Sequence, residues 1–200
     1  MVYLNNVIGF INDLLKDRIS NYPTATMDGV MNQTVTNQTG ANGQSRIIIY
    51  PSIIDLSGKA NYTGLDKRVP FTGYHRLMGS TFTRVVEQEY GDDLMTILSV
   101  TDIQLIVWGW RDKINHKPEQ FALILADTLP AGSVIADEFK TLGIRELKIV
   151  EAGITYDQRT IFNQEIQGVP YFLGPETFVF SIRYRIEGSY IKGCLNKCEC

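Results

Sequence analysis

The feature that most limits how this chain can fold is the regular alternation of apolar and polar residues at positions 177–187. In an extended strand, alternate residues point to opposite faces, so this segment would bury one face and wet the other. The apolar set is Phe178, Phe180, Ile182, Tyr184 and Ile186. Eleven extended residues would span roughly 35 Å, so we expect this strand to project beyond a compact sheet.

A second segment is suited to the centre of the same sheet. Residues 102–110 read DIQLIVWGW and are almost all apolar, which is typical of a strand covered on both faces. We expect Leu105, Val107 and Ile182 to be core residues beneath the first and second helices. Trp110, next to charged residues at the strand end, is a candidate partner contact. Residues 146–162 contain two further strand-like pieces.

Two more strand segments carry turn signals. Residues 46–50 are rich in β-branched side chains, and we expect Pro51 to end that strand. Residues 81–90 and 94–100 predict a hairpin that turns at Gly91-Asp92-Asp93.

Two or three helices are expected. From Leu4 to Ile19 the apolar residues recur at three- and four-residue intervals. This helix should end before Tyr22-Pro23, because the residue before a proline avoids helical geometry. Residues 118–129 carry a second apolar stripe, with a proline in the first turn. Ser133 can cap a third, shorter helix over residues 134–142.

The segment from Thr24 to Ser45 is dominated by Asn, Gln, Thr and Gly. It has too few large apolar residues to offset the entropy of ordering, so we expect a flexible loop or arm. The fold predicted for residues 1–200 is a single α+β domain. It has a mixed, mainly antiparallel sheet, two or three helices packed on one face, the polar loop and an extended hairpin. Residues 188–200 would form a cysteine-bearing C-terminal tail.

The charge balance argues against a protein whose main task is to grip phosphates. Nineteen Lys and Arg stand against 22 Asp and Glu, and the formal net charge is −3. The basic residues form no cluster of the kind that nucleic-acid binding needs. The apolar stretch at residues 1–15 has no basic leader and is interrupted by polar residues, so we expect neither a signal peptide nor a membrane span.

One short motif matches a catalytic pattern. Tyr90-Gly91-Asp92-Asp93 resembles the hairpin tip on which template-dependent RNA polymerases present metal ligands. Two-metal chemistry also needs carboxylates from another strand and a basic nucleotide channel, and the sequence displays neither. Gly-Asp-Asp is equally typical of an ordinary β-turn. We therefore expect a turn, with a magnesium-dependent nucleotidyl transferase or nuclease using Asp92 and Asp93 as the alternative.

The remaining candidates for chemistry are histidines and cysteines. His75 and His116 stand in polar contexts typical of loops, without a metal or triad motif around them. Cys194, Cys198 and Cys200 fall in the last seven residues. They could give a zinc ion three ligands, with the fourth from a neighbouring subunit, or be reduced thiols on a solvent-facing tail. We predict no catalytic residue, cofactor or metal.

The order of the expected elements carries a resemblance. It runs from an apolar N-terminal helix through a long loop and strands to DIQLIVWGWRD, then a helix at 118–129, a strand pair and the closing strand TFVFSIRYRIEGSY. This order resembles the tail-terminator and tail-completion proteins of tailed bacteriophages, which form rings between head connector and tail. The resemblance covers most of the chain and depends on element order, not on a diagnostic motif. The Asn-rich loop and the cysteine-bearing tail depart from the shorter members and are more similar to ring proteins of crAss-like phages.

The resemblance implies a structural virion protein and not an enzyme. We expect a homo-oligomeric ring, hexamer or dodecamer, at the head-to-tail junction, made in the host cytoplasm and without membrane contact. Its partners would be portal or adaptor and tail proteins, with genomic DNA only passing through the channel. A ring subunit shows two different patches to its neighbours, and the segments 24–45, 81–100 and 177–187 could extend them. A capsid decoration protein is a further alternative.

Overall fold

Strand β5 (Asp92–Trp110) lies at the centre of the sheet, between β4 (Phe71–Glu89) and β8 (Thr177–Ile191), and runs antiparallel to both. The computed structural model describes residues 2–39, 43, 45–54, 60–62, 66–89, 92–129, 132–133, 144–162 and 174–191. Residues 103–108 of β5 are all buried, so the expected central strand, covered on both faces, is confirmed.

The described strands form one sheet in the order β3-β2-β1-β4-β5-β8-β7-β6. Its other members are β1 (Thr26–Thr39), β2 (Ser45–Ile54), β3 (Ala60–Tyr62), β6 (Gly132–Ser133) and β7 (Ile144–Thr155). Strands β1 and β4 run parallel, and the other neighbouring pairs are antiparallel. The predicted fold class, α+β with a mixed and mainly antiparallel sheet, is therefore confirmed.

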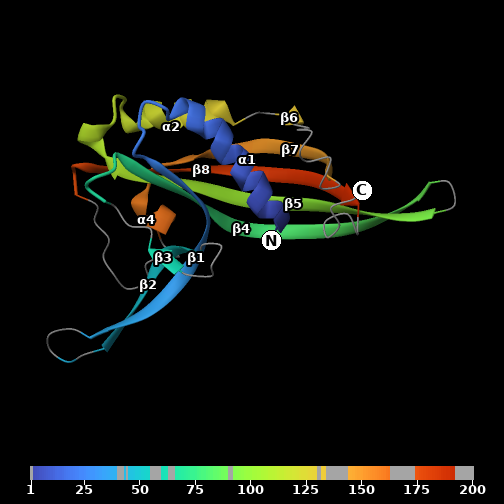
Figure 1. Cartoon of the computed structure of the whole chain (residues 1–200), viewed down its shortest axis with the longest axis horizontal. Helices are drawn as coiled ribbons and strands as arrows, with labels where there is room; N and C mark the ends of the chain where they lie inside the picture. The colour runs from blue at the N-terminus through green and yellow to red at the C-terminus, as the bar shows by residue number, and fades with distance from the viewer. Residues whose placement is uncertain are drawn as a thin grey trace.

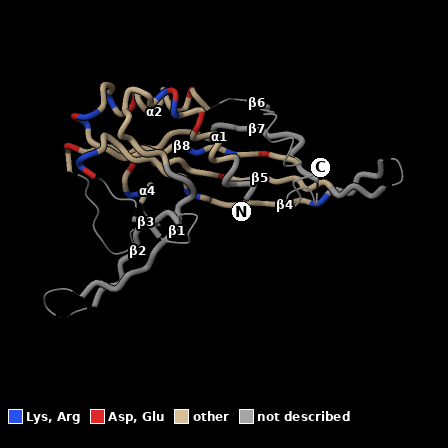
Figure 2. Tube along the Cα trace, in the orientation of Figure 1, with Lys and Arg blue, Asp and Glu red and all other residues tan. Residues whose placement is uncertain are grey.

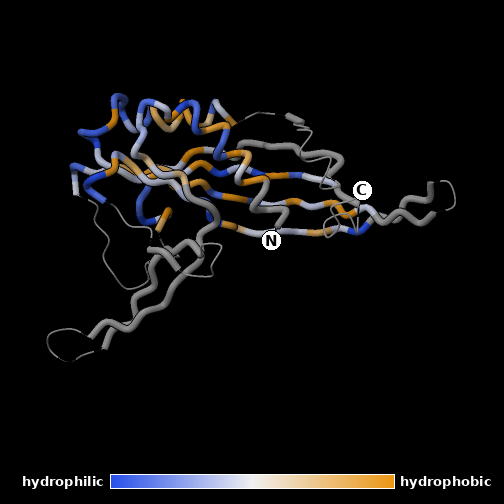
Figure 3. Tube along the Cα trace, in the orientation of Figure 1, coloured by the Kyte–Doolittle hydropathy of each residue, from blue (hydrophilic) through white to orange (hydrophobic). Residues whose placement is uncertain are grey.

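Helices α1 (Val2–Arg18) and α2 (Pro118–Thr128) pack against one face of the sheet (Figure 1). As expected, Pro118 opens α2. The Phe121 ring of α2 lies 5.0 Å from that of Phe71 and 5.9 Å from that of Phe180, measured between centroids. The large core beneath the helices includes Ile103, Leu105, Val107 and the whole alternating set Phe178, Phe180, Ile182, Tyr184 and Ile186. Figure 3 shows this concentration of apolar residues along the strands.

The short helix α4 (Gln158–Phe162) packs on the opposite face of the sheet. Its buried Ile161 and Phe162 form a second cluster with Ile106 and Trp108 of β5. These two β5 residues alternate with Leu105 and Val107, so they point to the other side. A 3-10 turn, η1 (Arg111–Lys113), links β5 to the loop before α2. The sheet is thus covered on both faces near the end of β5.

The polar segment expected as a loop from Thr24 to Ser45 is largely a strand. Residues 26–39 form β1, which pairs with β2 from Met31 opposite Ile53 to Thr39 opposite Ser45. The loop interpretation was wrong for residues 26–39, because backbone hydrogen bonds in a hairpin can order a segment with few large apolar residues, and Thr-rich sequences suit strands.

Three boundaries also differ from the sequence expectations. Strand β2 continues through Pro51 to Ile54, because proline is tolerated on a strand with a free edge, and β3 pairs only with residues 52–54. Ser133 belongs to β6 instead of capping a helix, and residues 134–142 lie outside the described residues. The second strand-like piece of 146–162 is in part helix α4.

Two ribbons project from the helix-covered body (Figure 1). The β1–β2 hairpin leaves it at one end, and the far parts of β4 and β5 leave it at the other. Within the described residues, β8 pairs with β5 from Thr96 onward, and residues 92–95 pair with β4. The predicted extended hairpin is therefore present and longer than expected.

Candidate functional site

The long edge of β4 is the first candidate for function. Strand β1 pairs with β4 only at Thr72, Gly73 and His75, and then turns away to pair with β2. Residues 77–89 pair with β5 on one side and with no strand on the other within the described part of the chain. Such an edge presents a row of backbone N–H and C=O groups that another strand can bind.

Little in this edge discourages pairing. Natural edge strands are usually protected by charged residues, proline, bulges or short length. Residues 77–83 include no charged residue and no proline, and their only irregularity is a bulge between Leu77 and Gly79. Every side chain from residue 77 to residue 84 is exposed. The edge is therefore open to pairing.

Large apolar side chains are exposed on both faces of the same ribbon. Phe82 is 59% exposed and lies opposite Ser99, whereas Leu98 is 42% exposed and lies opposite Thr83. Phe82 and Thr83 are consecutive, so Phe82 and Leu98 point to opposite faces. Grouped apolar residues on a surface are typical of interaction sites. The open edge and these side chains together define an interaction surface, here called the β4 edge, residues 77–83.

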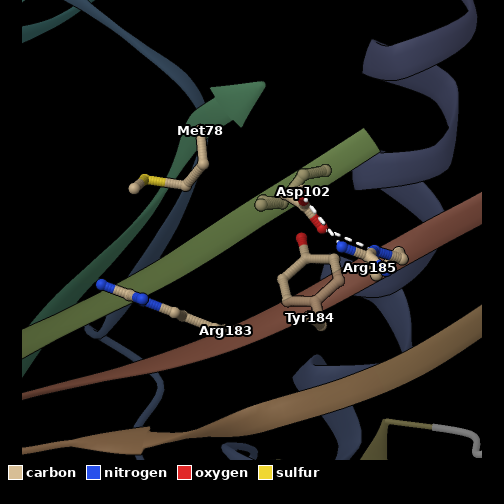
Figure 4. Close-up of a pocket in the computed structure, with 6 residues that line it drawn as sticks. Met78, Asp102, Arg183, Tyr184 and Arg185 are labelled. Carbon is tan, nitrogen blue, oxygen red and sulfur yellow. Dashed lines mark hydrogen bonds and ion pairs between the residues drawn. The ribbon is translucent and has the colours of Figure 1, made fainter. Parts of the chain in front are cut away.

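A shallow pocket of about 300 Å³ lies next to the β4 edge (Figure 4). It is lined by Met78, Asp102, Ile103, Arg183, Tyr184 and Arg185. Arg185 donates two hydrogen bonds to Asp102, from Nε to Oδ1 at 2.8 Å and from Nη2 to Oδ2 at 3.3 Å. These hydrogen bonds lower the pKa of Asp102 and raise that of Arg185.

The pocket has modest chemical capacity. Both members of the ion pair are 48% exposed, so water screens their attraction and the pair contributes little stability. Arg183 extends away from the pair in Figure 4 and is exposed. The lining supplies positive charge for an anion and no nucleophile beside a base.

His75 lies in a buried chain of hydrogen bonds, not in a polar loop as the sequence suggested. Its Nε2 lies 2.7 Å from Asn12 Oδ1, and its Nδ1 lies 2.7 Å from the Tyr184 hydroxyl. Burial lowers the pKa of His75 to about 3 and raises the pKa of Tyr184 well above its usual value. The neutral imidazole therefore donates from Nε2 to Asn12 and accepts at Nδ1 from Tyr184. This chain, Asn12–His75–Tyr184, joins α1 to β4 and β8.

A second polar chain crosses the opposite face. Arg76 Nη1 donates to the Ile161 carbonyl at 2.9 Å, and Nη2 donates to Gln104 Oε1. Gln104 Nε2 in turn donates to Ser181 Oγ at 2.6 Å. These bonds tie α4 to the three central strands. Both polar chains are buried, so they fix the positions of helices and offer no open site to a substrate.

Asp92 and Asp93 lie within β5, opposite Glu89 and Gln88 of β4. The predicted hairpin is confirmed, but Asp92 and Asp93 belong to a strand and not to the expected turn. Tyr90 and Gly91 lie outside the described residues. In the described part of the chain, no three His, Cys, Asp or Glu side chains come together to hold a metal ion.

The other sequence candidates are dispersed. His116 is exposed in the loop before α2, as expected. Trp110 is partly buried; its Nε1 donates to the Asp66 carbonyl at 3.0 Å, and its ring lies under Lys67. Its polar edge is thus bound within its own chain. Cys194, Cys198 and Cys200 lie outside the described residues.

Sequence reasoning missed the first half of β4. Residues 71–80 contain Gly73 and Gly79 together with His75 and Arg76, which lower strand propensity, so the strand was expected to begin only at Thr81. The exposed Leu77 and Met78 were missed with it. The absence of charged residues from 77 to 83 was the sequence signal that could have indicated an exposed strand open to pairing.

Comparisons with known proteins assign no family to this chain. It matches no protein-family model and no curated protein. Among the described helices, none combines the length and the apolar character needed to cross a membrane.

Proposed function

We propose that this protein is a structural subunit that assembles with copies of itself into a ring at the head-to-tail junction of a tailed bacteriophage. In this role it is not an enzyme. It surrounds the DNA channel and joins a portal or adaptor protein to tail proteins. The resemblance in element order supports this role, and so does the shape of the molecule.

The observation that carries the proposal is the pair of ribbons at opposite ends of the body (Figure 1). A ring requires each subunit to offer one patch to the neighbour on one side and a different patch to the neighbour on the other side. The β1–β2 hairpin and the β4–β5 ribbon are two such patches. They differ in sequence, and they reach in different directions from a body that has its own core.

The charge distribution agrees with a channel that DNA passes through without being held. The net charge of the chain is −3. Figure 2 shows Lys and Arg intermixed with Asp and Glu around α2, with no basic stripe along the described part of the chain. Tight DNA binding depends on clustered basic residues, so a subunit of this kind would not retard a moving genome.

Electron microscopy and native mass spectrometry of the purified full chain test the proposal. We expect closed rings of one copy number, hexamer or dodecamer, and antibody labelling of virions at the junction between head and tail. A chain that stays monomeric at all concentrations up to about 1 mM would contradict the proposal. Labelling spread over the capsid would instead indicate a decoration protein.

A further inference from the structure

We infer that the β4 edge is the docking site for the β1–β2 hairpin of a second copy of this chain. The outer edge of β2 in one copy adds as a strand beside residues 77–83 of β4 in the next copy. The inference rests on the proposed ring, and it names the segments through which neighbouring copies in that ring bind each other.

The outer edge of β2 is free over the residues needed for this contact. On one side, β2 pairs with β1 from Ser45 to Ile53. On the other side, β3 covers only Ser52 to Ile54. Residues 45–51 thus have a second edge without a strand partner in the described part of the chain.

The two edges match in length and in chemistry. Residues 45–51 of β2, SRIIIYP, and residues 77–83 of β4, LMGSTFT, each number seven. Both runs are rich in β-branched or aromatic residues, and Arg46 is the only charged residue in either. Pairing residues 45–50 with residues 77–83 satisfies the backbone groups of both edges, and Arg46 meets no like charge within residues 77–83. Pro51, which has no N–H to donate, ends the paired run. An exposed sheet edge binds an added strand through main-chain hydrogen bonds, so a strand of matching length can pair along the whole open run.

The β1–β2 hairpin that binds a given β4 edge has to belong to another copy of the chain. Strand β1 lies between β2 and β4 in the sheet order, so the outer edge of β2 faces away from its own β4. The hairpin and the β4–β5 ribbon also leave the body at opposite ends (Figure 1). Each copy can therefore give its hairpin to one neighbour and its β4 edge to the other. This is a head-to-tail contact, which gives a ring where the rotation between neighbouring copies closes, whereas pairing of β4 with β4 would stop at a dimer.

Two variants of the full chain test the contact from its two sides. Phe82→Lys places a charge on the β4 edge, and lysine is a residue that natural edges use to block pairing. Leu123→Lys is the matched control, because Leu123 is also 59% exposed but lies on α2. The second variant replaces residues 34–50 by Asn-Gly, a favoured two-residue turn, joining Gln33 to its partner Pro51.

We expect Phe82→Lys and the shortened hairpin each to raise the concentration at half assembly at least tenfold, measured by native mass spectrometry. Leu123→Lys should change it less than twofold. Circular dichroism confirms that each variant is folded. In the wild type, hydrogen exchange should show protection gained together at residues 45–50 and 77–83 on assembly. An equimolar mixture of the two defective variants should form one-to-one dimers, because one intact hairpin meets one intact edge.

Rings that persist in both variants would overturn this contact and leave the proposed ring standing. If Phe82→Lys failed to assemble while the shortened-hairpin variant still formed rings, and the mixture gave no dimers, the hairpin would not be the segment that binds the β4 edge. A wild-type chain that never assembles would reject the proposed function together with the contact.

Discussion

The buried chain Asn12–His75–Tyr184 makes the stability of this protein depend on pH. His75 is inaccessible to solvent, and burial lowers its pKa to about 3 in the folded chain. In the unfolded chain a histidine has a pKa of about 6.5. The folded state therefore binds fewer protons than the unfolded state between these two values. The stabilisation is complete above about pH 6.5 and is lost progressively as the pH falls toward 3.

The magnitude follows from the two pKa values. Each pH unit below 6.5 costs about 1.4 kcal/mol of unfolding free energy while His75 stays neutral in the folded state. From pH 7.5 to pH 5.0 the loss from this residue is about 2 kcal/mol. The folded-state pKa values of Asp66, Asp102 and Asp157 are also lowered, but their unfolded values lie near 4, so they contribute almost nothing above pH 5. Among the described residues whose pKa is shifted, His75 is the one whose unfolded-state pKa lies between pH 5.0 and pH 7.5.

Urea unfolding of the full chain at pH 7.5 and pH 5.0, under conditions that keep it monomeric, measures this difference. His75→Gln should remove most of it, because the Gln amide can donate to Asn12 and accept from Tyr184 without titrating. His116→Gln, an exposed loop substitution, should retain the full difference. Equal pH dependence in His75→Gln and the wild type would refute the reasoning.

Three further changes test the core and the ribbon. Val107→Asp should abolish soluble expression, because it buries an unpaired charge at a site with 0% exposure; a soluble, folded variant would refute its placement in the core. Gly109→Ala should cost about 1–3 kcal/mol in urea unfolding, since its Cβ would lie 2.4 Å from the Pro70 carbonyl oxygen, whereas Gly79→Ala meets no atom and should be neutral. The double change Asp92→Ala/Asp93→Ala should leave folding and assembly intact; loss of a magnesium-dependent nuclease or polymerase activity would support the enzymatic alternative.

The sequence predicted the body of the fold well, because burial there enforces periodicity. Residues 177–187 alternate since one face of β8 lies under two helices, and α2 begins at Pro118 as its turn chemistry indicates. The structure extends β8 to Ile191, and β4 begins ten residues earlier than the sequence indicated. Gly73, Gly79, His75 and Arg76 lower the strand propensity of this part of β4, and the exposed residues 77–80 have no buried face that would impose alternation.

The candidate site was harder to predict, because it depends on which strands are neighbours. No local sequence pattern indicates that the pairing of β1 with β4 stops at His75. The β4 edge is open because this pairing stops there. His75 illustrates the same limit. A histidine between Tyr74 and Arg76 reads as polar and exposed, yet its two hydrogen-bond partners come from residues 63 positions before it and 109 positions after it.

The coverage of β5 changes along its length, and this change separates folding from assembly. On the face that carries α4, Gln104, Ile106 and Trp108 are buried, whereas Leu98 on the same face is 42% exposed. The covered end contributes most of the apolar burial that stabilises the monomer, so changes at the open end should alter stability little. Assembly would draw on the surface that the monomer leaves uncovered. Variants of the β4 edge can therefore lose the ring and keep the fold, which is the separation that a test of the proposed function requires.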